Sequence, residues 1–193
     1  MFIAVIQAVE SGMALEIDDE DGFLLHEVQQ NPEVFTILYR RYLPRVYRYL
    51  FFKTGNPDDA EELTSQVFLA ALERMPHYQH RGQFSTWLFS IARNKAADFY
   101  RTQYARTRYK FLQFASVSDP EDDPLTRVIQ GENLEKLNEL LSLLTDDEIE
   151  ILRLRLAAKL QFSEIAALLK RKPSSVKMAY YRLLTRLANG MEP

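Results

Sequence analysis

The sequence predicts an all-α fold in two helical domains joined by a flexible acidic linker. From Pro32 onward, apolar residues recur at spacings of three and four, which is the period of an amphipathic helix. No segment has the alternating pattern of a β-strand, and an acidic stretch with Asp119-Pro120 and Asp123-Pro124 separates two helical regions. The predicted boundaries are an acidic extension at 1–30, a first domain at 31–112, the linker at 113–130 and a second domain at 131–190.

The first domain begins with two predicted helices. An apolar stripe that includes Phe35 and Tyr42 marks the first helix, and Gly55-Asn56-Pro57 ends it. The second helix begins at Pro57 or Asp58 and ends at Pro76. Its first turn is rich in carboxylates, which suit the positive end of the helix dipole.

A third long helix, a helix from about Leu125 through Leu144 and three shorter ones complete the prediction. The third helix runs from about Ser85, as its N-cap, to about Tyr109. In the second domain, Thr145-Asp-Asp-Glu has the form of a capping box and opens a helix through Ala157. The last two helices span Phe162–Leu169 and Ser175–Ala188, separated by a basic turn.

Charge is distributed unevenly along the chain. The formal net charge is −3, but segment by segment it is −7 for residues 1–30, +6 for 31–115, −8 for 116–148 and +6 for 149–193. Only the surface that faces phosphates must be basic. Two basic helical segments that alternate with acidic segments therefore favour nucleic acid as a partner.

Several classes of protein are excluded by composition. The chain has no cysteine, so disulfides and thiolate zinc sites are ruled out. No apolar run approaches the roughly 18 residues of a membrane span. The apolar start at Met1–Val9 lacks a basic beginning and a cleavage site, so it does not resemble a signal peptide. We expect a cytoplasmic protein, whose translation starts at Met1 or Met13.

The last two predicted helices have the length and spacing of a helix-turn-helix. The first would turn Ile165, Ala166 and Leu169 inward, and the second would bury Val176, Leu183 and Leu187. In such a motif, the N-terminal half of the second helix enters the major groove of DNA. An ordinary helical hairpin with solvated lysines is the alternative. The side chains expected to face DNA are Ser174, Ser175, Lys177 and Met178 near bases and Arg171, Lys172, Arg182 and Arg186 near phosphates.

Cationic and aromatic residues are interleaved along the third predicted helix. This arrangement suits stacking on unpaired bases with phosphate neutralisation alongside. For Trp87, a core position at helical spacing is favoured over direct base contact, whereas Asn94 could hydrogen-bond a base edge. The interleaved residues are Trp87, Phe99, Tyr100, Tyr104 and Tyr109 with Arg93, Lys95, Arg101, Arg106 and Arg108.

Motifs in both domains occur in an order typical of one protein family. In the first domain they are Phe35-x-x-Leu-Tyr-x-x-Tyr, Asp59-Ala-Glu-Glu-Leu-Thr-x-x-Val-Phe-Leu and Trp87-Leu-x-x-Ile-Ala-Arg-Asn, followed by Asp98 and Arg101. These resemble conserved region 2 of bacterial sigma factors of the extracytoplasmic-function (ECF) group. Leu152-Arg-Leu, Phe162-x-Glu-Ile-Ala, Val176-Lys and Arg182 resemble region 4 of the same group. The resemblance covers about Pro32 to Ala188.

The resemblance implies a promoter-specificity subunit of RNA polymerase. Such a subunit binds core polymerase at the β′ clamp and at β, melts a −10 element through region 2 and recognises a −35 element through region 4. An anti-sigma factor is a further implied partner, and no cofactor is implied. Carried over by position, the core-binding residues are Asp58, Asp59, Glu62, Ser65 and Gln66.

The resemblance also assigns the DNA contacts. The loop from His77 to Gln83, together with Asn94, would form the pocket for a flipped −10 base, which must offset a few kcal/mol of lost stacking. Tyr181 joins the −35 contacts named above. The residues assigned to the −10 element are His80, Arg81, Trp87, Arg93, Asn94, Lys95 and Arg101.

The chain departs from the family pattern at three places. Ser65-Gln66 replaces the usual Gln-Glu, which removes a carboxylate from the core-binding face. Lys170-Arg171 stands where the family usually has a glycine and a buried aliphatic residue. Met178-Ala179 replaces a common basic residue after Val-Lys, so the −35 sequence preference is expected to differ from the commonest one.

Other functions are less well supported by the sequence. His77-x-x-His80 has a possible metal-ligand spacing but lies in a loop without clustered carboxylates, so no metal site is expected. No glycine-rich phosphate loop or catalytic triad is present, and an enzyme is not expected. Two alternatives remain open. One is a dimeric DNA-binding regulator that acts without polymerase, and the other is a degenerate family member that serves as a protein-interaction module.

Overall fold

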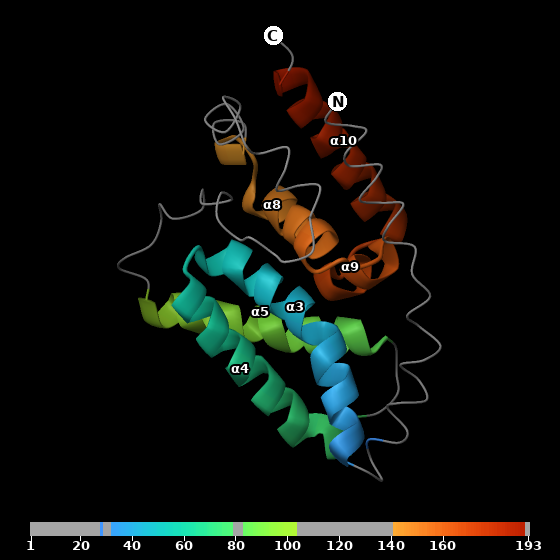
Figure 1. Ribbon diagram of the computed structural model, residues 1–193. Coiled ribbons are helices and arrows are strands. Elements are labelled where there is room, and N and C mark those ends of the chain that lie inside the picture. Colours follow the sequence, from blue (N-terminus) through green and yellow to red (C-terminus); the bar gives the residue numbers. More distant parts are fainter. Residues whose placement is uncertain (1–27, 29–31, 79–82, 104–140, 192–193) are drawn as a thin grey trace.

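The computed structural model describes residues 28, 32–78, 83–103 and 141–191. Every regular element in these ranges is helical, which confirms the all-α prediction (Figure 1). The predicted linker, most of the predicted helix from Leu125 through Leu144 and most of the acidic extension lie outside the described residues. None of the helices described is long and apolar enough to cross a membrane.

Three long helices form the N-terminal module. Figure 1 shows α3, α4 and α5 packed together, with the C-terminal helices on the side away from α4. Apolar residues at helical spacing, among them Leu38, Val46 and Leu63, are completely or almost completely buried between these helices. The elements of this module are η1 (Pro32–Val34), α3 (Phe35–Thr54), α4 (Pro57–Arg74), η2 (Met75–His77) and α5 (Phe84–Gln103).

Local sequence determines the turn between α3 and α4. Gly55 has a φ of 67° and donates its N–H to the carbonyl of Phe51 at 2.8 Å, which ends α3 in a left-handed residue. Asn56 then caps α4, because its side-chain oxygen accepts a hydrogen bond from the Asp59 N–H at 3.1 Å. Pro57 at the first helical position completes the predicted start of α4.

The predicted N-cap of the third helix is wrong. Helix α5 begins at Phe84, so Ser85 lies inside the first turn and is buried. Its hydroxyl donates to the carboxylate of Glu164, a residue of α9. The Ser85 side chain therefore bonds a residue of another helix, whereas the N-cap rule had predicted that it would cap its own helix.

The last three predicted helices of the C-terminal module are present, and α10 extends beyond the predicted 175–188 at both ends. Thr145 and Glu148 form the predicted capping box at the start of α8. After α8 the chain continues as a π-helical turn, η3, and then enters the two helices of the hairpin. The bounds are α8 (Asp146–Leu152), η3 (Arg153–Ala157), α9 (Phe162–Leu169) and α10 (Pro173–Met191).

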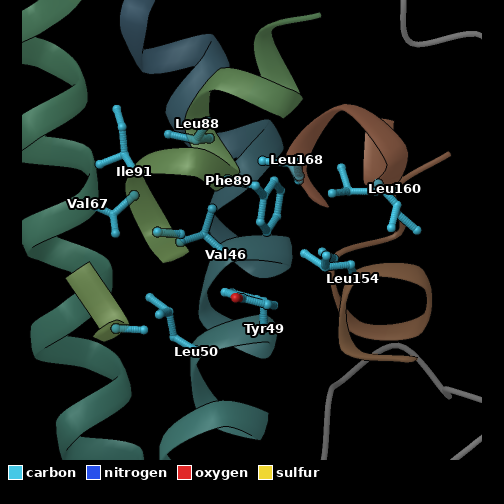
Figure 2. Close-up of a cluster of buried hydrophobic side chains, with 14 of the residues drawn as sticks. Val46, Tyr49, Leu50, Val67, Leu88, Phe89, Ile91, Leu154, Leu160 and Leu168 are labelled. Atoms are coloured by element: carbon cyan, nitrogen blue, oxygen red, sulfur yellow. The ribbon is translucent and has the colours of Figure 1, made fainter. Parts of the chain in front are cut away.

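The two modules pack against each other through one continuous buried cluster. Figure 2 shows Leu154, Leu160 and Leu168 of the C-terminal module beside Tyr49 and Phe89 of the N-terminal module. The rings of Tyr49 and Phe89 meet edge to face at 5.6 Å. All five side chains are buried, so this contact excludes water.

Candidate nucleic-acid interface

The turn between α9 and α10 is closed by a lysine in a left-handed conformation. Lys170 has φ 54° and ψ 46°, and its N–H points to the carbonyls of Ala166 and Ala167. The next N–H, from Arg171, donates to Ala166 at 2.9 Å. These bonds are typical of a helix C-cap, so Lys170 performs the role that glycine usually takes.

The scaffold of the hairpin is buried as predicted, except that Leu169 is half-buried. Ile165 and Ala166 of α9 pack with Val176, Leu183 and Leu187 of α10, and none of these side chains is more than 4% exposed. Burial of this face fixes which side of α10 points outward. The opposite face is therefore available to a partner.

All the predicted −35 residues lie on the outer surface of the hairpin. Met178 is 62% exposed and Tyr181 is 41% exposed, although both are large and partly apolar. The Lys177 ammonium lies 5.9 Å from the centre of the Tyr181 ring. The structure thus brings hydroxyl, cationic and apolar groups together on one surface. The exposed residues are Arg171, Lys172, Ser174, Ser175, Lys177, Met178, Tyr181, Arg182 and Arg186.

Two arginines beside this face are paired with carboxylates of α8. Arg171 forms an ion pair with Asp147, and Arg186 contacts the Glu148 carboxylate at 2.6 Å. The Thr145 backbone N–H and Arg186 both hold the pKa of Glu148 below its ordinary value. These pairs neutralise part of the positive charge near the predicted phosphate contacts.

The predicted −10 residues on α5 have different environments. Asn94 is exposed, Lys95 is half-buried, and Arg101 forms an ion pair with Asp98. Trp87 is half-buried, with its ring centre 4.7 Å from that of Tyr78, which favours the core interpretation of this residue. His80 and Arg81 lie outside the described residues.

Arg93 is engaged by the other module. Its Nη1 donates to the carbonyl of Leu168 on α9 at 2.9 Å, and its Nε donates to the carboxylate of Glu150 on α8 at 3.2 Å. Arg93 therefore lies between α5 and the C-terminal helices, while the adjacent Asn94 faces solvent.

Glu150 is the centre of a buried polar cluster that the sequence did not predict. Its carboxylate accepts a hydrogen bond from the Tyr49 hydroxyl at 2.8 Å and pairs with Lys53 at 2.7 Å. Arg93 and Arg153 complete the set, the latter at 3.7 Å. Burial alone would raise the pKa of Glu150, but Lys53, Tyr49 and Arg153 together hold it below its ordinary value. Burial raises the pKa of Tyr49 well above its usual range, so its hydroxyl stays protonated as a donor.

The residues that join the modules form two stripes at a spacing of four. On α3, Arg45, Tyr49 and Lys53 all contact the C-terminal module, and the Arg45 Nε donates to the Ala158 carbonyl at 2.8 Å. On α5, Ser85 and Arg93 do the same on either side of Phe89. Residues four apart lie on one face of a helix. In the sequence, polar residues at a spacing of four within an apolar helix face were the signal that could have identified these contact residues.

The predicted core-binding residues lie together on α4. Asp58, Glu62 and Ser65 are exposed, and Gln66 donates its side-chain amide to Glu62 at 3.1 Å. Asp59 is half-buried near the helix start. The same helix exposes two apolar side chains, Leu69 at 59% and Leu72 at 44%.

The described residues contain no metal site. No group of three or more His, Cys, Asp or Glu side chains in these ranges could hold a metal ion. His77 is exposed, and its predicted partner His80 lies outside the described residues.

Comparisons with known proteins identify the family. A family model of sigma-70 region 2 matches residues 38–106. ECF RNA polymerase sigma factor SigD of Mycobacterium tuberculosis is 30% identical over 149 residues, covering 75% of this chain and 70% of SigD. ECF RNA polymerase sigma factor BldN of Streptomyces coelicolor is 29% identical over 157 residues, covering 81% of this chain and 60% of BldN.

A solved structure supports the same fold. The sigma factor RpoE, in complex with the anti-sigma factor NepR from Bartonella quintana, matches with a TM-score of 0.57 and 20% identity. The match covers 81% of this chain and 95% of RpoE. The chain belongs to the ECF group of RNA polymerase sigma factors, the promoter-specificity subunits of bacterial RNA polymerase.

Proposed function

We propose that this chain binds core RNA polymerase through α4, opens the −10 element through α5 and recognises the −35 element through α10. The observation that carries the proposal is the outer face of α10. It exposes Ser174, Ser175, Lys177 and Met178 on a helix whose opposite face is buried against α9. Hydroxyl, ammonium and thioether groups on the N-terminal half of such a helix can contact base edges and thymine methyl groups in the major groove.

The outer face of α4 suits a protein partner rather than DNA. Glu62 supplies a carboxylate there, and Leu69 and Leu72 supply exposed apolar area. A mixture of apolar anchors and acidic groups is typical of a protein interface, whereas phosphates would be repelled. The proposed partner of this face is the β′ clamp of core polymerase.

The exposed amide of Asn94 is the proposed reader of the −10 element. It lies beside Lys95 and within two turns of Arg101, so cations can neutralise phosphates while the amide bonds a base edge. Trp87 is assigned a supporting role, because its ring packs on Tyr78 and Phe84.

We also propose an anti-sigma factor as a partner, a cytoplasmic location and no catalytic activity of the chain itself. RpoE was solved bound to an anti-sigma factor, and its fold is that of this chain. The relatives are specificity subunits of a polymerase that supplies the catalysis.

Transcription from purified components tests the proposed function. Core polymerase with this chain should give run-off transcripts from a subset of a genomic promoter library, and core polymerase alone should give none. Binding of the chain to duplex DNA without any polymerase-dependent transcript would instead support a free-standing DNA-binding regulator.

A charge reversal on α4 tests the polymerase contact. Glu62→Lys should weaken binding to core polymerase by about 1–3 kcal/mol, because it places a cation where a carboxylate is paired in the interface. Glu61→Lys is the matched control, since Glu61 is also exposed but points about 100° away around the helix. Equal affinities of the two variants in a fluorescence titration would remove Glu62 from the interface.

A further inference from the structure

The buried face of α10 determines where Met178 points. Val176 and Leu183 of this helix are buried, and an α-helix turns by about 100° per residue. Met178 therefore lies roughly 140–160° around the helix from both of them, close to the centre of the outer face. Its side chain is long and 62% exposed, so it projects from this face toward any partner that α10 meets.

Polar side chains flank Met178 on both sides. The Lys177 ammonium lies 5.9 Å from the centre of the Tyr181 ring, within the range of a cation–π contact. The Tyr181 ring is itself packed near α9, with its centre 6.0 Å from that of the Phe162 ring. At about 100° per residue, the lysine–tyrosine pair lies on one side of Met178 and the exposed Arg182 lies on the other. The centre of the outer face therefore carries an apolar group between cations.

An apolar group at this position has one match among the base edges of the major groove. Guanine presents two acceptors there, cytosine a donor, adenine a donor and an acceptor, and thymine an acceptor and its 5-methyl group. Methionine has no hydrogen-bond donor and its sulfur is only a weak acceptor, so it cannot replace water on a guanine or cytosine edge. Contact with a G·C pair would therefore bury unpaired polar groups, whereas contact with thymine buries apolar area.

Other exposed side chains at the start of α10 discriminate less between bases. The hydroxyls of Ser174 and Ser175 can donate or accept, so they suit either kind of polar group on a base edge. Single exposed apolar residues are common on protein surfaces and need no function. Met178 differs from these because it lies in the N-terminal half of the helix that is proposed to enter the major groove.

We propose that Met178 determines the base pair at one position of the −35 element by packing on the 5-methyl group of a thymine. Met178 is thus a specificity-determining residue that selects A·T over G·C at that position. The inference rests on the proposed function, since it requires α10 to recognise the −35 element. It adds which chemical group of the promoter is read, and by which side chain.

Selection of promoters by holoenzyme identifies the position to test. Core polymerase carrying the full chain is given promoter duplexes whose −35 region is randomised, and the bound duplexes are sequenced. The selected −35 element should contain at least one position at which thymine strongly predominates in one strand. Each such thymine is then replaced by deoxyuridine, which removes the methyl group and leaves every hydrogen-bonding group in place.

The response to deoxyuridine separates a methyl contact from other effects. At one thymine, the replacement should weaken holoenzyme binding about fourfold, the loss that corresponds to one buried methyl group. With Met178→Ala, thymine and deoxyuridine at that position should bind equally. Met178→Leu keeps an apolar side chain and should keep the preference for thymine. With the wild-type chain, 5-methylcytosine should bind better than cytosine at the same position.

Leu143→Ala is the matched control, because Leu143 is 72% exposed but precedes α8 and lies outside α10. This variant should keep the wild-type response to deoxyuridine at every thymine. The inference is overturned if no thymine is selected, if none is sensitive to deoxyuridine, or if Met178→Ala retains the wild-type sensitivity. A holoenzyme that still selects a −35 element in that case leaves the proposed function intact. A holoenzyme that transcribes but selects no sequence at −35 rejects the proposed role of α10 itself.

Discussion

The two DNA-facing helices differ in how they are supported. Helix α10 is held by its own hairpin, through buried contacts with α9, and the side chains of its outer face are exposed. Helix α5 supports the contact between modules through Ser85, Phe89 and Arg93 on one face and presents Asn94 on another. A substitution on α10 should therefore change one property, whereas a substitution on α5 can change DNA binding and module packing together.

The largest expected effect is the loss of the aromatic ring that both modules share. Phe89→Ala should lower the free energy of unfolding by about 3–5 kcal/mol, because the ring is fully buried between Tyr49 and the C-terminal leucines. Urea denaturation followed by circular dichroism measures the change. Met178→Ala on the exposed face of α10 should shift stability by no more than about 0.5 kcal/mol. Similar midpoints for the two variants would contradict the difference in support described above.

The next effect separates the two DNA contacts. Asn94→Ala should weaken opening of the −10 element, and Lys177→Ala should weaken −35 recognition, each by about 1–3 kcal/mol. On a pre-melted template, Lys177→Ala should open as well as the wild type, while Asn94→Ala should still bind the −10 strand poorly. The measurement is open-complex formation by holoenzyme on matched duplex and bubble templates. If both variants failed equally on the bubble template, −10 opening and −35 recognition would not be separate functions of α5 and α10.

A smaller effect tests whether the modules unfold as one unit. Asn56→Ala and Thr145→Ala each remove an N-cap and should each cost about 1 kcal/mol. Because one buried cluster joins the modules, both substitutions should lower the midpoint of the same unfolding transition. Thr145→Ser keeps the accepting hydroxyl and should retain most of the stability. Two separate transitions, each sensitive to only one cap, would show that the modules unfold independently.

The smallest effect concerns the paired arginine beside the recognition face. Asp147→Asn should change stability by less than about 1 kcal/mol, because both partners are exposed. It should release Arg171 for phosphate, so log affinity for a random-sequence duplex should fall more steeply with log salt, by about one unit of slope. Asp146→Asn removes the same charge without breaking the pair, and its slope should match the wild type. Identical slopes for the two variants would exclude Arg171 as a phosphate contact.

Local signals predicted most of the fold. The capping box at Thr145, the break at Gly55 and the buried face of the hairpin were all read from neighbouring residues, and each is present. Ser85 was assigned incorrectly, because a serine at a helix start satisfies the N-cap rule whether or not a tertiary partner exists. Local propensity could not show that Glu164, far along the chain, would take its hydroxyl.

The contact between the modules could not be predicted from the sequence. Glu150 has the sequence context of a solvated carboxylate on an acidic helix start. Its burial depends on Tyr49, Lys53 and Arg93, which lie at least 57 residues away in sequence. Of the residues assigned by family position, Asp58, Glu62 and Ser65 on α4 and all those on α10 are exposed, as an interface requires, and their contacts stay predictions. Arg93 is the exception. It was assigned only as a contact to the −10 element, but in the structure it bonds Glu150 and the Leu168 carbonyl.

The hydrogen bond from Arg93 to the Leu168 carbonyl has a consequence for avidity. Two linked binding modules gain avidity, on the order of 10²–10⁴ over either module, only when geometry lets both engage at once. In the structure α5 contacts α9, and α9 leads directly into α10, whereas −10 and −35 elements are about 25 base pairs, or roughly 85 Å, apart. In this arrangement the proposed contacts would act one at a time, and the chain would leave a site that resembles half of a promoter as quickly as a single module would.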